Sequence, residues 1–359
     1  MATDDVLTVA VIGCGRMGAF TRPELRARIG AQWLPLNHAE GVLATEGLRL
    51  VACCDIDETA ALRAAERYGM PAAFTNLQEM LKSVRPDIVT IATRTPTRTD
   101  IIEAVCAAGV KGIYAEKPLS QNVASARHCA AVMDACGVAF SYGTQRRYMP
   151  IFRQARDIVA SGELGDIVKI EVHHGRGALL WSHPHAVDIL SFFASDRPIE
   201  LVQADLTIPE GSVRPNLIDA DPIVNRATMT FREGPTGVIT SNTGMSVVIS
   251  ATGGILAVRD DGTWLEERPT RAPGTARPGG PKVIEPRGPI TSGLVVALSE
   301  LRDAIRLGTP PSLTPSQVAE QQATLFGFAA SHLAGGTQVR PDAVEPDLTI
   351  TGRKNGLVA

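Results

Sequence analysis

The stretch "VAVIGCGRMGAF" at residues 9–20 joins an apolar run to a cluster of glycines. Gly13, Gly15 and Gly18 have the GxGxxG spacing. In a dinucleotide-binding unit, such glycines allow a tight turn, close approach of a pyrophosphate and packing of a helix on a strand. Here the motif follows a strand-like run and precedes a segment expected to open a helix, which is the context it needs. We therefore expect a cofactor to contact Gly13, Gly15, Arg16, Met17 and Gly18.

Apolar runs and helical patterns alternate through the first 145 residues. The apolar runs occupy residues 7–13, 48–55, 87–93, 112–116 and 138–143, and helical patterns occupy residues 57–69, 98–109 and 120–137. Apolar runs without polar alternation fit strands that are covered on both faces. Strands that alternate with helices favour a parallel doubly wound sheet. The sequence therefore predicts an α/β Rossmann domain over residues 1–145.

The pattern changes after Tyr148, where a helix at 150–162 is followed by several strands. The strand-like segments lie at 166–175, 199–208, 225–233, 236–244, 246–254 and 254–268. Successive strands separated by turn signals favour a mostly antiparallel sheet. Residues 269–291 are rich in Pro, Gly and Arg and predict a surface loop. We expect an α+β substrate and oligomerisation domain over 146–359, with helices at 292–308 and 314–336, the second packing back on the first domain.

The composition excludes several classes of protein. The 359 residues carry a net charge of −3 without a basic run, which argues against nucleic acid as a partner. No apolar stretch reaches the length of a membrane span, so we expect no membrane partner. The acidic N-terminus runs directly into a strand-like segment and does not resemble a signal peptide. Six cysteines without a CxxC pair indicate buried free thiols and a cytoplasmic protein.

Asp55 ends the second apolar run, in "VACCDID" at residues 51–57. A carboxylate there can bind both hydroxyls of an adenosine ribose and repels a 2′-phosphate, which favours NAD over NADP. The interval from Gly13 to Asp55 is well over the usual ~20–30 residues. Pro23 and Pro35 interrupt helical continuity within it. We interpret residues 19–47 as containing an insertion that reshapes the mouth of the site or makes an oligomer contact.

Lys117 follows the fourth apolar run, in "YAEKPLS" at residues 114–120. A residue at the carboxyl end of a parallel strand faces the ligand crevice. The Lys117–Pro118 pair indicates a constrained turn in which a cis bond is an option. Lys117 is a candidate proton donor or charge clamp between nicotinamide and substrate. The alternative is a solvent-exposed lysine at a strand end.

Together these motifs resemble those of the Gfo/Idh/MocA oxidoreductases. The set comprises GxGxxG, an acidic end to the second strand, "ATRTP" at 92–96, "EKP" at 116–118 and an HxxD formed by His185 and Asp188. The resemblance covers both predicted domains. It implies a Rossmann domain followed by an open-faced sheet, a tightly held nicotinamide cofactor, and substrates that are sugars, inositols or their derivatives. Exposed sheets of this kind usually pair, so we expect a homodimer or homotetramer.

The resemblance also assigns residues to the two ligands. It implies that Lys117 contacts the substrate and that "TQRRYMP" at 144–150 places Arg147 and Tyr148 on the substrate side. The further positions that we expect to contact the cofactor are Ile56, Thr93, Pro96, Glu116, Lys117 and Gln145.

Two positions depart from the family pattern. The family commonly has a histidine four residues after the proline of the third-strand motif, and here that residue is Asp100. Many members carry an aspartate four residues before the HxxD histidine, beside the reacting hydroxyl. Here that residue is Trp181. The second departure makes the acid/base set unusual.

Four of the seven histidines lie between residues 173 and 185. In "WSHPHAVD" (181–188), Pro184 suits the first turn of a helix. His185 and Asp188 would then share a face, and the carboxylate could orient the imidazole. Three interpretations compete: acid/base and substrate binding by His185 with His183, a metal site, or capping and core residues. No nearby Cys or Glu completes a metal set, so we expect no metal.

Three more residues of this region are substrate candidates. His173 and His174 are adjacent on a strand, so at most one of them faces the site, and we select His174. Arg176 suits an anionic group, although it could also be a solvated turn residue. Trp181 could stack on a sugar ring or fill the core between the domains. The expected substrate-side set is therefore Arg147, Tyr148, His174, Arg176, Trp181, His183 and Asp188.

The motifs together predict an NAD-dependent enzyme that oxidises a secondary hydroxyl of a carbohydrate or cyclitol. Lys117 and His185 would handle the proton, and NAD would accept the hydride. One alternative is an NAD-dependent glycoside hydrolase that recycles its cofactor through oxidation, elimination, hydration and reduction, on an anionic glycoside such as a sulfoquinovoside. A second alternative is a non-catalytic NAD-binding sensor.

Overall fold

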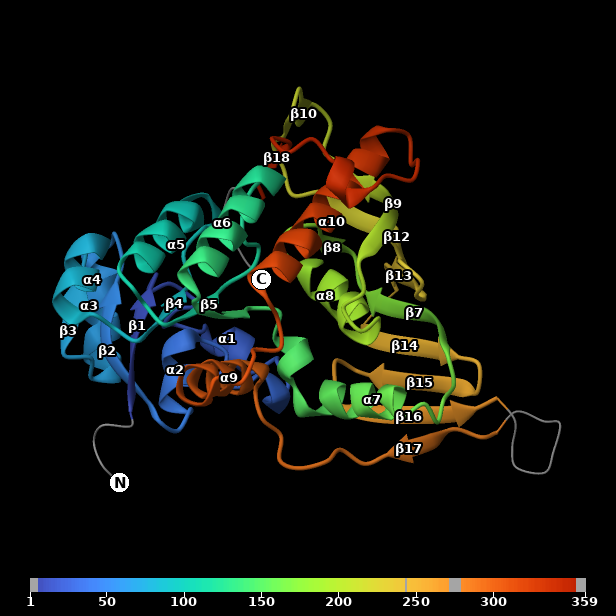
Figure 1. Ribbon diagram of the computed structural model, residues 1–359, viewed down its shortest axis with the longest axis horizontal. Helices are drawn as coiled ribbons and strands as arrows, with labels where there is room; N and C mark the ends of the chain where they lie inside the picture. Colours follow the sequence, from blue (N-terminus) through green and yellow to red (C-terminus); the bar gives the residue numbers. More distant parts are fainter. Residues whose placement is uncertain (1–5, 243, 271–278, 353–359) are drawn as a thin grey trace.

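The computed structural model describes residues 6–242, 244–270 and 279–352. Two sheets lie side by side, with a long helix, α10 (Pro315–Leu333), running between them (Figure 1). The first is a parallel sheet of six strands and the second a mixed sheet of nine. The predicted fold class is therefore confirmed.

The first sheet has the strand order β3-β2-β1-β4-β5-β6. Its strands are β1 (Leu7–Ile12), β2 (Leu48–Cys54), β3 (Ala72–Phe74), β4 (Ile88–Ile91), β5 (Gly112–Ala115) and β6 (Ala139–Tyr142). The order reverses between β1 and β4. In open α/β sheets, ligands bind outside the carboxyl ends of the strands at such a switch point. The glycine motif begins at the carboxyl end of β1, at this point.

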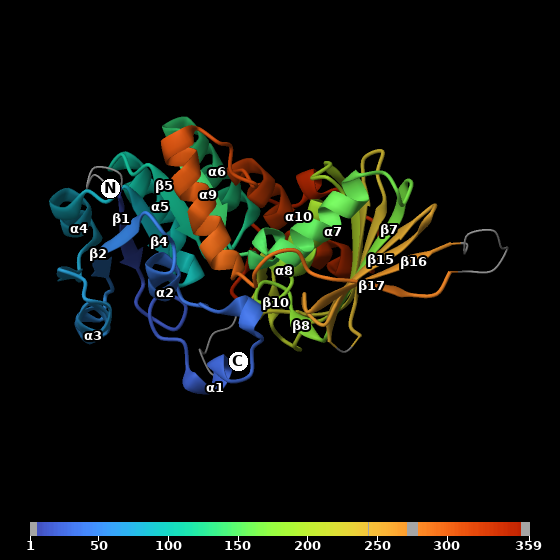
Figure 2. The same ribbon diagram turned by 90° about the horizontal axis from the view of Figure 1, so that it is seen from below.

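Helices cover both faces of this sheet. One face packs against α4 (Leu77–Val84), α5 (Arg98–Ala107) and α6 (Val123–Cys136). The other packs against α2 (His38–Leu43), α3 (Glu58–Tyr68) and α9 (Gly293–Leu307). The helix α9 comes from the C-terminal part of the chain, and Figure 2 shows it beside the first sheet. Strand β3 and helix α4 are additions to the elements that we predicted.

The first crossover helix of the Rossmann unit is split in two. A single helical turn follows the glycines, in which the Ala19 N–H donates to Gly15 O at 2.9 Å. The N–H groups of His38 and Ala39 then donate to Met17 O (2.8 Å) and Gly18 O (3.0 Å). In an unbroken helix, the carbonyl groups of Met17 and Gly18 would accept hydrogen bonds from the N–H groups four residues later in the chain. Residues 20–37 are therefore an insertion, with α2 completing the helix.

A proline and an asparagine determine where the two short helices α1 (Pro23–Arg26) and α2 begin. The insertion contains α1 and a 3₁₀ turn, η2 (Ala31–Trp33). Pro23 starts α1, where its missing N–H is tolerated. Asn37 caps α2 by accepting a hydrogen bond from the Glu40 N–H at 2.9 Å. The insertion predicted from the Gly13–Asp55 interval is therefore present, and it is shorter than the predicted range of residues 19–47.

The second sheet has the order β17-β16-β15-β14-β7-β13-β12-β8, and β9 also pairs with β12. Its strands are β7 (Ile167–His174), β8 (Gly177–Ala178), β9 (Ile199–Thr207), β12 (Ile223–Phe231), β13 (Thr236–Thr240), β14 (Met245–Ala251), β15 (Gly254–Arg259), β16 (Trp264–Pro269) and β17 (Lys282–Ile284). Only β7 and β13 pair in parallel among the described strands of this sheet.

The remaining elements are short or connect the two sheets. They are η3 (Thr95–Thr97), η4 (Gln145–Tyr148), α7 (Pro150–Ala160), α8 (Pro184–Phe193), β10 (Val213–Arg214), β11 (Leu217–Ile218), η5 (Pro341–Ala343) and β18 (Thr349–Ile350). Strands β10, β11 and β18 form a small third sheet. The helix α10 packs against α6 of the first sheet and against β9 and α8 of the second unit.

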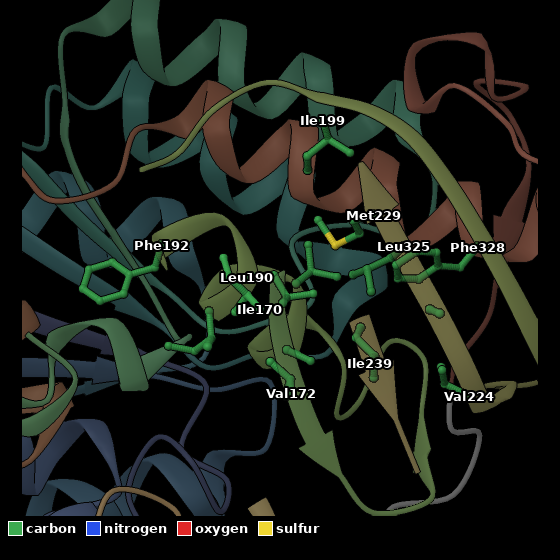
Figure 3. Packing of buried hydrophobic residues seen from close by; sticks show 14 of the residues in the cluster. Ile170, Val172, Leu190, Phe192, Ile199, Val224, Met229, Ile239, Leu325 and Phe328 are labelled. Atoms are coloured by element: carbon green, nitrogen blue, oxygen red, sulfur yellow. The ribbon is translucent and has the colours of Figure 1, made fainter. Parts of the chain in front are cut away.

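One face of the second sheet packs on helices. Every second residue along β14 from Met245 to Ile249 is buried, which is the pattern of a half-covered sheet. Figure 3 shows the buried cluster, in which Ile170 and Val172 of β7 meet Leu190 of α8. Residues of α10 join the same cluster. This packing fixes the position of α8, and with it His185.

Two sequence predictions need correction or restriction. The segment 269–291 is not entirely loop, because residues 282–284 form β17 on the edge of the sheet; residues 271–278 of the predicted loop lie outside the described part. All six cysteines are free, but Cys136 is exposed and the other five are buried. Within the described residues, none of the helices combines the length and the apolarity that crossing a bilayer requires.

Candidate functional site

The glycine loop leaves a backbone surface open at its centre. A Cβ on Gly18 would lie 1.7 Å from Gly13 O, and a Cβ on Gly13 (φ +90°) would lie 2.9 Å from the carbonyl carbon of Ala92. These two glycines are therefore required by the turn and by its packing on β4. At Gly15, a Cβ would meet no described atom within 4 Å. That open position is where the backbone of this motif receives a pyrophosphate.

Asp55 is held against the glycine loop at the end of β2. Its Oδ2 accepts a hydrogen bond from the Cys14 N–H at 2.6 Å, and its Oδ1 accepts one from the Asp57 N–H at 2.9 Å. Asp57 in turn caps α3. Ile56, between them, is 96% exposed. A fixed carboxylate beside an exposed apolar side chain fits the ribose and adenine of a dinucleotide, as the sequence predicts.

The turns after β4 and β5 are joined by Arg98. Its Nη2 donates to Thr93 O at 2.6 Å, and its Nη1 donates to Pro118 O. The Thr93 hydroxyl is buried without a hydrogen-bond partner, and Pro96 is exposed in η3. Arg98 itself is buried. No local sequence signal identifies Arg98, because its two partners lie in separate loops.

Lys117 lies against Trp181, at the position where the family that the motifs resemble often carries an aspartate. The Lys117–Pro118 bond is cis. Lys117 Nζ donates to Trp181 O at 2.6 Å and lies 4.2 Å from the centroid of the indole. The guanidinium of Arg16, from the glycine loop, lies 5.1 Å from the same ring. Burial lowers the pKa of Lys117 to about 8; Glu116 opposes this shift, whereas nearby arginines add to it.

Glu116 and Gln145 are buried polar residues, one before Lys117 and one at the start of η4. Burial alone would raise the pKa of Glu116, but His38, Lys117 and Arg98 together lower it, so the group is a carboxylate. His38 Nε2 lies 3.5 Å from Glu116 Oε1. The Gln145 Oε1 atom has no partner among the described residues. Glu116 thus places a buried negative charge next to Lys117.

Three histidines meet between α8 and β7. The rings of His174 and His183 have centroids 5.0 Å apart. Neither ring nitrogen of His183, nor Nδ1 of His185, has a hydrogen-bond partner in the described chain. Burial lowers the pKa of His174 to about 4, that of His183 to about 3 and that of His185 well below its usual value. All three rings are therefore neutral near pH 7, when each has one nitrogen free to accept a proton.

Asp188 pairs with Arg147 and not with His185. Arg147 Nε donates to Asp188 Oδ1 at 2.8 Å, and Gln321 Nε2 donates to the same oxygen at 3.1 Å. Both side chains of the ion pair are 0% exposed. A buried guanidinium needs a carboxylate partner, and the aspartate of HxxD is the one that supplies it. The expectation that Asp188 orients His185 is therefore wrong in this structure.

Two further residues expected on the substrate side lie elsewhere. Tyr148 is completely buried, and its hydroxyl oxygen accepts a hydrogen bond from the Tyr142 N–H at 3.3 Å. Together with Arg147 it belongs to the packing of η4. Arg176 is exposed in the turn between β7 and β8. Of the predicted substrate set, the structure brings Trp181, His174 and His183 together with Lys117 and His185.

A cluster that sequence analysis missed completes the site. Arg146 donates to both carboxylate oxygens of Asp261, from Nε at 2.7 Å and from Nη2 at 3.1 Å. The Arg146 guanidinium lies 4.8 Å from the ring centroid of Trp33, in the insertion. The Trp33 ring meets His185 edge-on, with centroids 6.3 Å apart. The only sequence signals were the first arginine of "TQRRYMP" and the hairpin-like "DDGT".

Asp221 is a further residue that the sequence did not indicate. Its Oδ1 and Oδ2 accept hydrogen bonds from the N–H groups of Leu180 (2.8 Å) and Trp181 (3.1 Å). It therefore holds the backbone that presents a carbonyl to Lys117. Within the described residues, no group of three or more His, Cys, Asp or Glu side chains is arranged to hold a metal ion.

The parallel sheet, the glycine loop and the fixed Asp55 define a Rossmann domain that binds NAD(P). Residues 7–144 match the GFO_IDH_MocA model, described as "Oxidoreductase family, NAD-binding Rossmann fold". The N-terminal region of the chain thus matches the NAD-binding domain of the Gfo/Idh/MocA oxidoreductases, the family that its motifs resemble.

Curated relatives match the same part of the chain. An inositol 2-dehydrogenase of Rhizobium meliloti is 30% identical over 144 residues, covering 40% of this chain and 43% of that protein. A D-glucoside 3-dehydrogenase of Escherichia coli is 28% identical over 167 residues, covering 46% and 42%. The chain thus matches less than half the length of these relatives.

Solved structures share the fold across both units. The complex of levoglucosan dehydrogenase with NADH and levoglucosan covers 93% of this chain and 99% of its own, with a TM-score of 0.76 and 16% identity. An oxidoreductase of Agrobacterium radiobacter, in complex with NAD+, L-tartaric acid and magnesium, covers 94% and 99%, with a TM-score of 0.74 and 15% identity. At these identities the likeness describes the fold alone.

Proposed function

We propose that this protein is an NAD-dependent dehydrogenase that oxidises a secondary hydroxyl of a sugar or cyclitol. The observation that carries the proposal is the juxtaposition of Lys117, Trp181 and Arg16 of the glycine loop, with His185 close enough to Lys117 for the two to interact electrostatically. The activities named for the curated relatives, on inositol and on a D-glucoside, support this substrate class. The proposal includes a cofactor unit over residues 1–145 and a substrate unit over 146–359, whose helix α9 also covers the first sheet.

The residues of the crevice fit a nicotinamide dinucleotide. The open backbone at Gly15 would receive the pyrophosphate, and Asp55 would accept hydrogen bonds from the ribose hydroxyls. The charge of Asp55 would repel a 2′-phosphate, so NAD would be preferred over NADP. The buried Thr93 hydroxyl would gain a partner in the bound state. When bound, the cofactor supplies a hydride acceptor.

We assign the proton to His185 and the developing negative charge to Lys117. The His185 ring is neutral because burial lowers its pKa, so one of its nitrogens can accept the hydroxyl proton. Lys117 is mostly an ammonium group below its pKa of about 8. In that form Nζ can donate to the hydroxyl oxygen and stabilise an alkoxide. Trp181 and Trp33 flank these two groups and reduce their access to water.

A substrate survey tests the proposal. The purified protein is supplied with NAD or NADP and with inositols, free sugars and aryl glycosides, including acidic ones. We expect NADH in step with an oxidised product, preference for NAD, and a loss of about a hundredfold or more in kcat for His185→Asn. Lys117→Met should bind NAD and lose turnover.

Three outcomes would contradict the proposal. Absence of nicotinamide binding would remove the cofactor assignment. Aglycone release without net NADH would identify a redox-neutral glycosidase, a reading that the dehydrogenases named above do not favour. Cofactor binding without turnover across the survey would indicate a sensor.

A further inference from the structure

The insertion, residues 20–37, leaves the first sheet and reaches the second. In Figure 2 the part of this blue segment between α1 and α2 comes close to α8 of the second unit. Two hydrogen bonds tie it to Asp261, in the turn between β15 and β16 of the second sheet, and a third ties it to Ser292 at the start of α9. Gln32 Nε2 donates to Asp261 O at 3.1 Å, Trp33 Nε1 donates to Asp261 Oδ2 at 3.0 Å, and the Ser292 hydroxyl donates to Pro35 O at 2.9 Å.

Trp33 is fixed on two sides within this connection. Asp261 accepts its indole N–H, and the Arg146 guanidinium lies over its ring at 4.8 Å. Arg146 and Asp261 are in turn bound to each other through two hydrogen bonds, at 2.7 and 3.1 Å. A bidentate arginine–carboxylate pair holds a defined geometry. The indole therefore has little freedom to rotate away.

The ring held in this way contacts the proposed proton acceptor. Trp33 meets His185 at an interplanar angle of 90°, with centroids 6.3 Å apart, an edge-to-face arrangement that aromatic rings favour. Asp188, which would orient His185 by spacing alone, is engaged by Arg147 and Gln321. His185 Nδ1 has no hydrogen-bond partner among the described residues. No hydrogen bond to His185 Nδ1 from another described residue orients the imidazole, and the contact with the Trp33 ring takes that role.

We infer that Trp33 is a positioning residue for His185, and that the insertion serves to bring it to the substrate site across the two units. The inference rests on the proposed function for its catalytic consequence. Trp33 orients the imidazole and excludes water from one side of it, and it forms a fixed wall that limits how far a substrate ring can extend beyond His185.

The charged and titratable groups that face His185 come from several elements. They are Arg146 of η4, Lys117 after β5, His174 of β7 and His183 before α8. The two cations oppose protonation of the imidazole, and burial has the largest effect. Removing the indole would admit water to His185 without removing any of these charges. Its pKa should then rise toward its usual value.

The test compares Trp33→Leu with Trp33→Phe and with a matched control. Trp264 is the control, because its Nε1 donates to Asp260, the neighbour of Asp261 in the same turn, at 3.2 Å. For Trp33→Leu we expect kcat to fall about tenfold or more, with NAD affinity unchanged. Trp33→Phe should restore most of the loss, because it retains an aromatic edge, and Trp264→Leu should resemble the wild type.

A second measurement does not depend on turnover. Histidine NMR of the cofactor-free protein follows the titration of His185, assigned with His185→Asn. We expect the His185 pKa to rise in Trp33→Leu and to stay low in Trp33→Phe and Trp264→Leu. A kcat for Trp33→Leu equal to that of Trp264→Leu, with an unshifted His185 titration, would overturn the inference. Failure of the wild type to oxidise any sugar would contradict the proposed function alone, because the titration still reports on Trp33.

Discussion

Arg146 and Arg147 are adjacent in the chain but have different partners, and this difference limits what the sequence can predict about the site. Arg146 binds Asp261 at the edge of the crevice, whereas Arg147 is buried against Asp188. The motif "TQRRYMP" selects the segment but not which arginine faces the ligand, because η4 turns successive side chains in different directions. The distinction depends on Asp261, a partner more than a hundred residues away. The positions of Lys117 after a strand end and of His185 at a helix start were predictable, because each follows a local signal.

Replacing Trp181 should change the pH dependence of Lys117. Lys117 Nζ has a carbonyl and an indole as neighbours, and burial lowers its pKa from 10.5 to about 8. If the ammonium stabilises the alkoxide, kcat/KM should fall as pH rises above about 8. Trp181→Asp places a carboxylate near Nζ, which should raise the Lys117 pKa and move this decline upward by about 1–3 pH units.

The matched variant for that measurement is Trp181→Phe. It retains an aromatic ring and the backbone carbonyl, so its decline should remain near pH 8. Profiles of kcat/KM against pH for the three proteins provide the comparison. Identical alkaline limbs in Trp181→Asp and Trp181→Phe would show that Lys117 does not govern this decline.

At the scale of elements, α8 shows how a correct local prediction can mislead about contacts. Pro184 starts the helix as predicted, and its apolar residues pack on the second sheet (Figure 3). The HxxD spacing places His185 and Asp188 on neighbouring positions of one face. The helix nevertheless lies so that Asp188 faces η4 and α10, while His185 faces the insertion. Tertiary packing of three elements decides this, and no local pattern contains it.

Removing the carboxylate of Asp188 should therefore lower stability. Asp188→Asn leaves the completely buried guanidinium of Arg147 with Asp196 as its remaining carboxylate, at 3.1 Å. Loss of one partner of a buried pair should reduce the free energy of unfolding by about 3 kcal/mol. Denaturant unfolding measures this change.

An exposed pair in the same chain provides the control. Asp342→Asn breaks the ion pair with Arg340, which is open to solvent, and should leave the unfolding midpoint unchanged. If Asp188→Asn is as stable as the wild type but has reduced turnover, Asp188 takes part in the reaction and does not serve mainly to stabilise the fold.

At the scale of the whole molecule, the chain does not divide cleanly near residue 145. The helices α9 and α10 were both predicted from their apolar stripes, but a stripe does not say which sheet it will cover. The helix α9 returns to the first sheet and covers it together with α2. Gly41 of α2 allows this close packing, because a Cβ there would lie 2.5 Å from Leu294. The first sheet is thus completed by residues from the end of the sequence.

Trimming α9 should therefore destabilise the first sheet. Leu298 is completely buried between α9 and that sheet, and Leu298→Ala should reduce the free energy of unfolding by about 2–5 kcal/mol. Hydrogen exchange should show the loss of protection in β5 and β6, which pack against α9. Leu307→Ala changes the same residue type in the same helix at a position 74% exposed, and should leave exchange unchanged.

An isolated 1–145 fragment lacks α9, so we expect it to expose this face of the first sheet and to bind NAD poorly. Full NAD affinity in that fragment would show that the first sheet folds without the C-terminal helix.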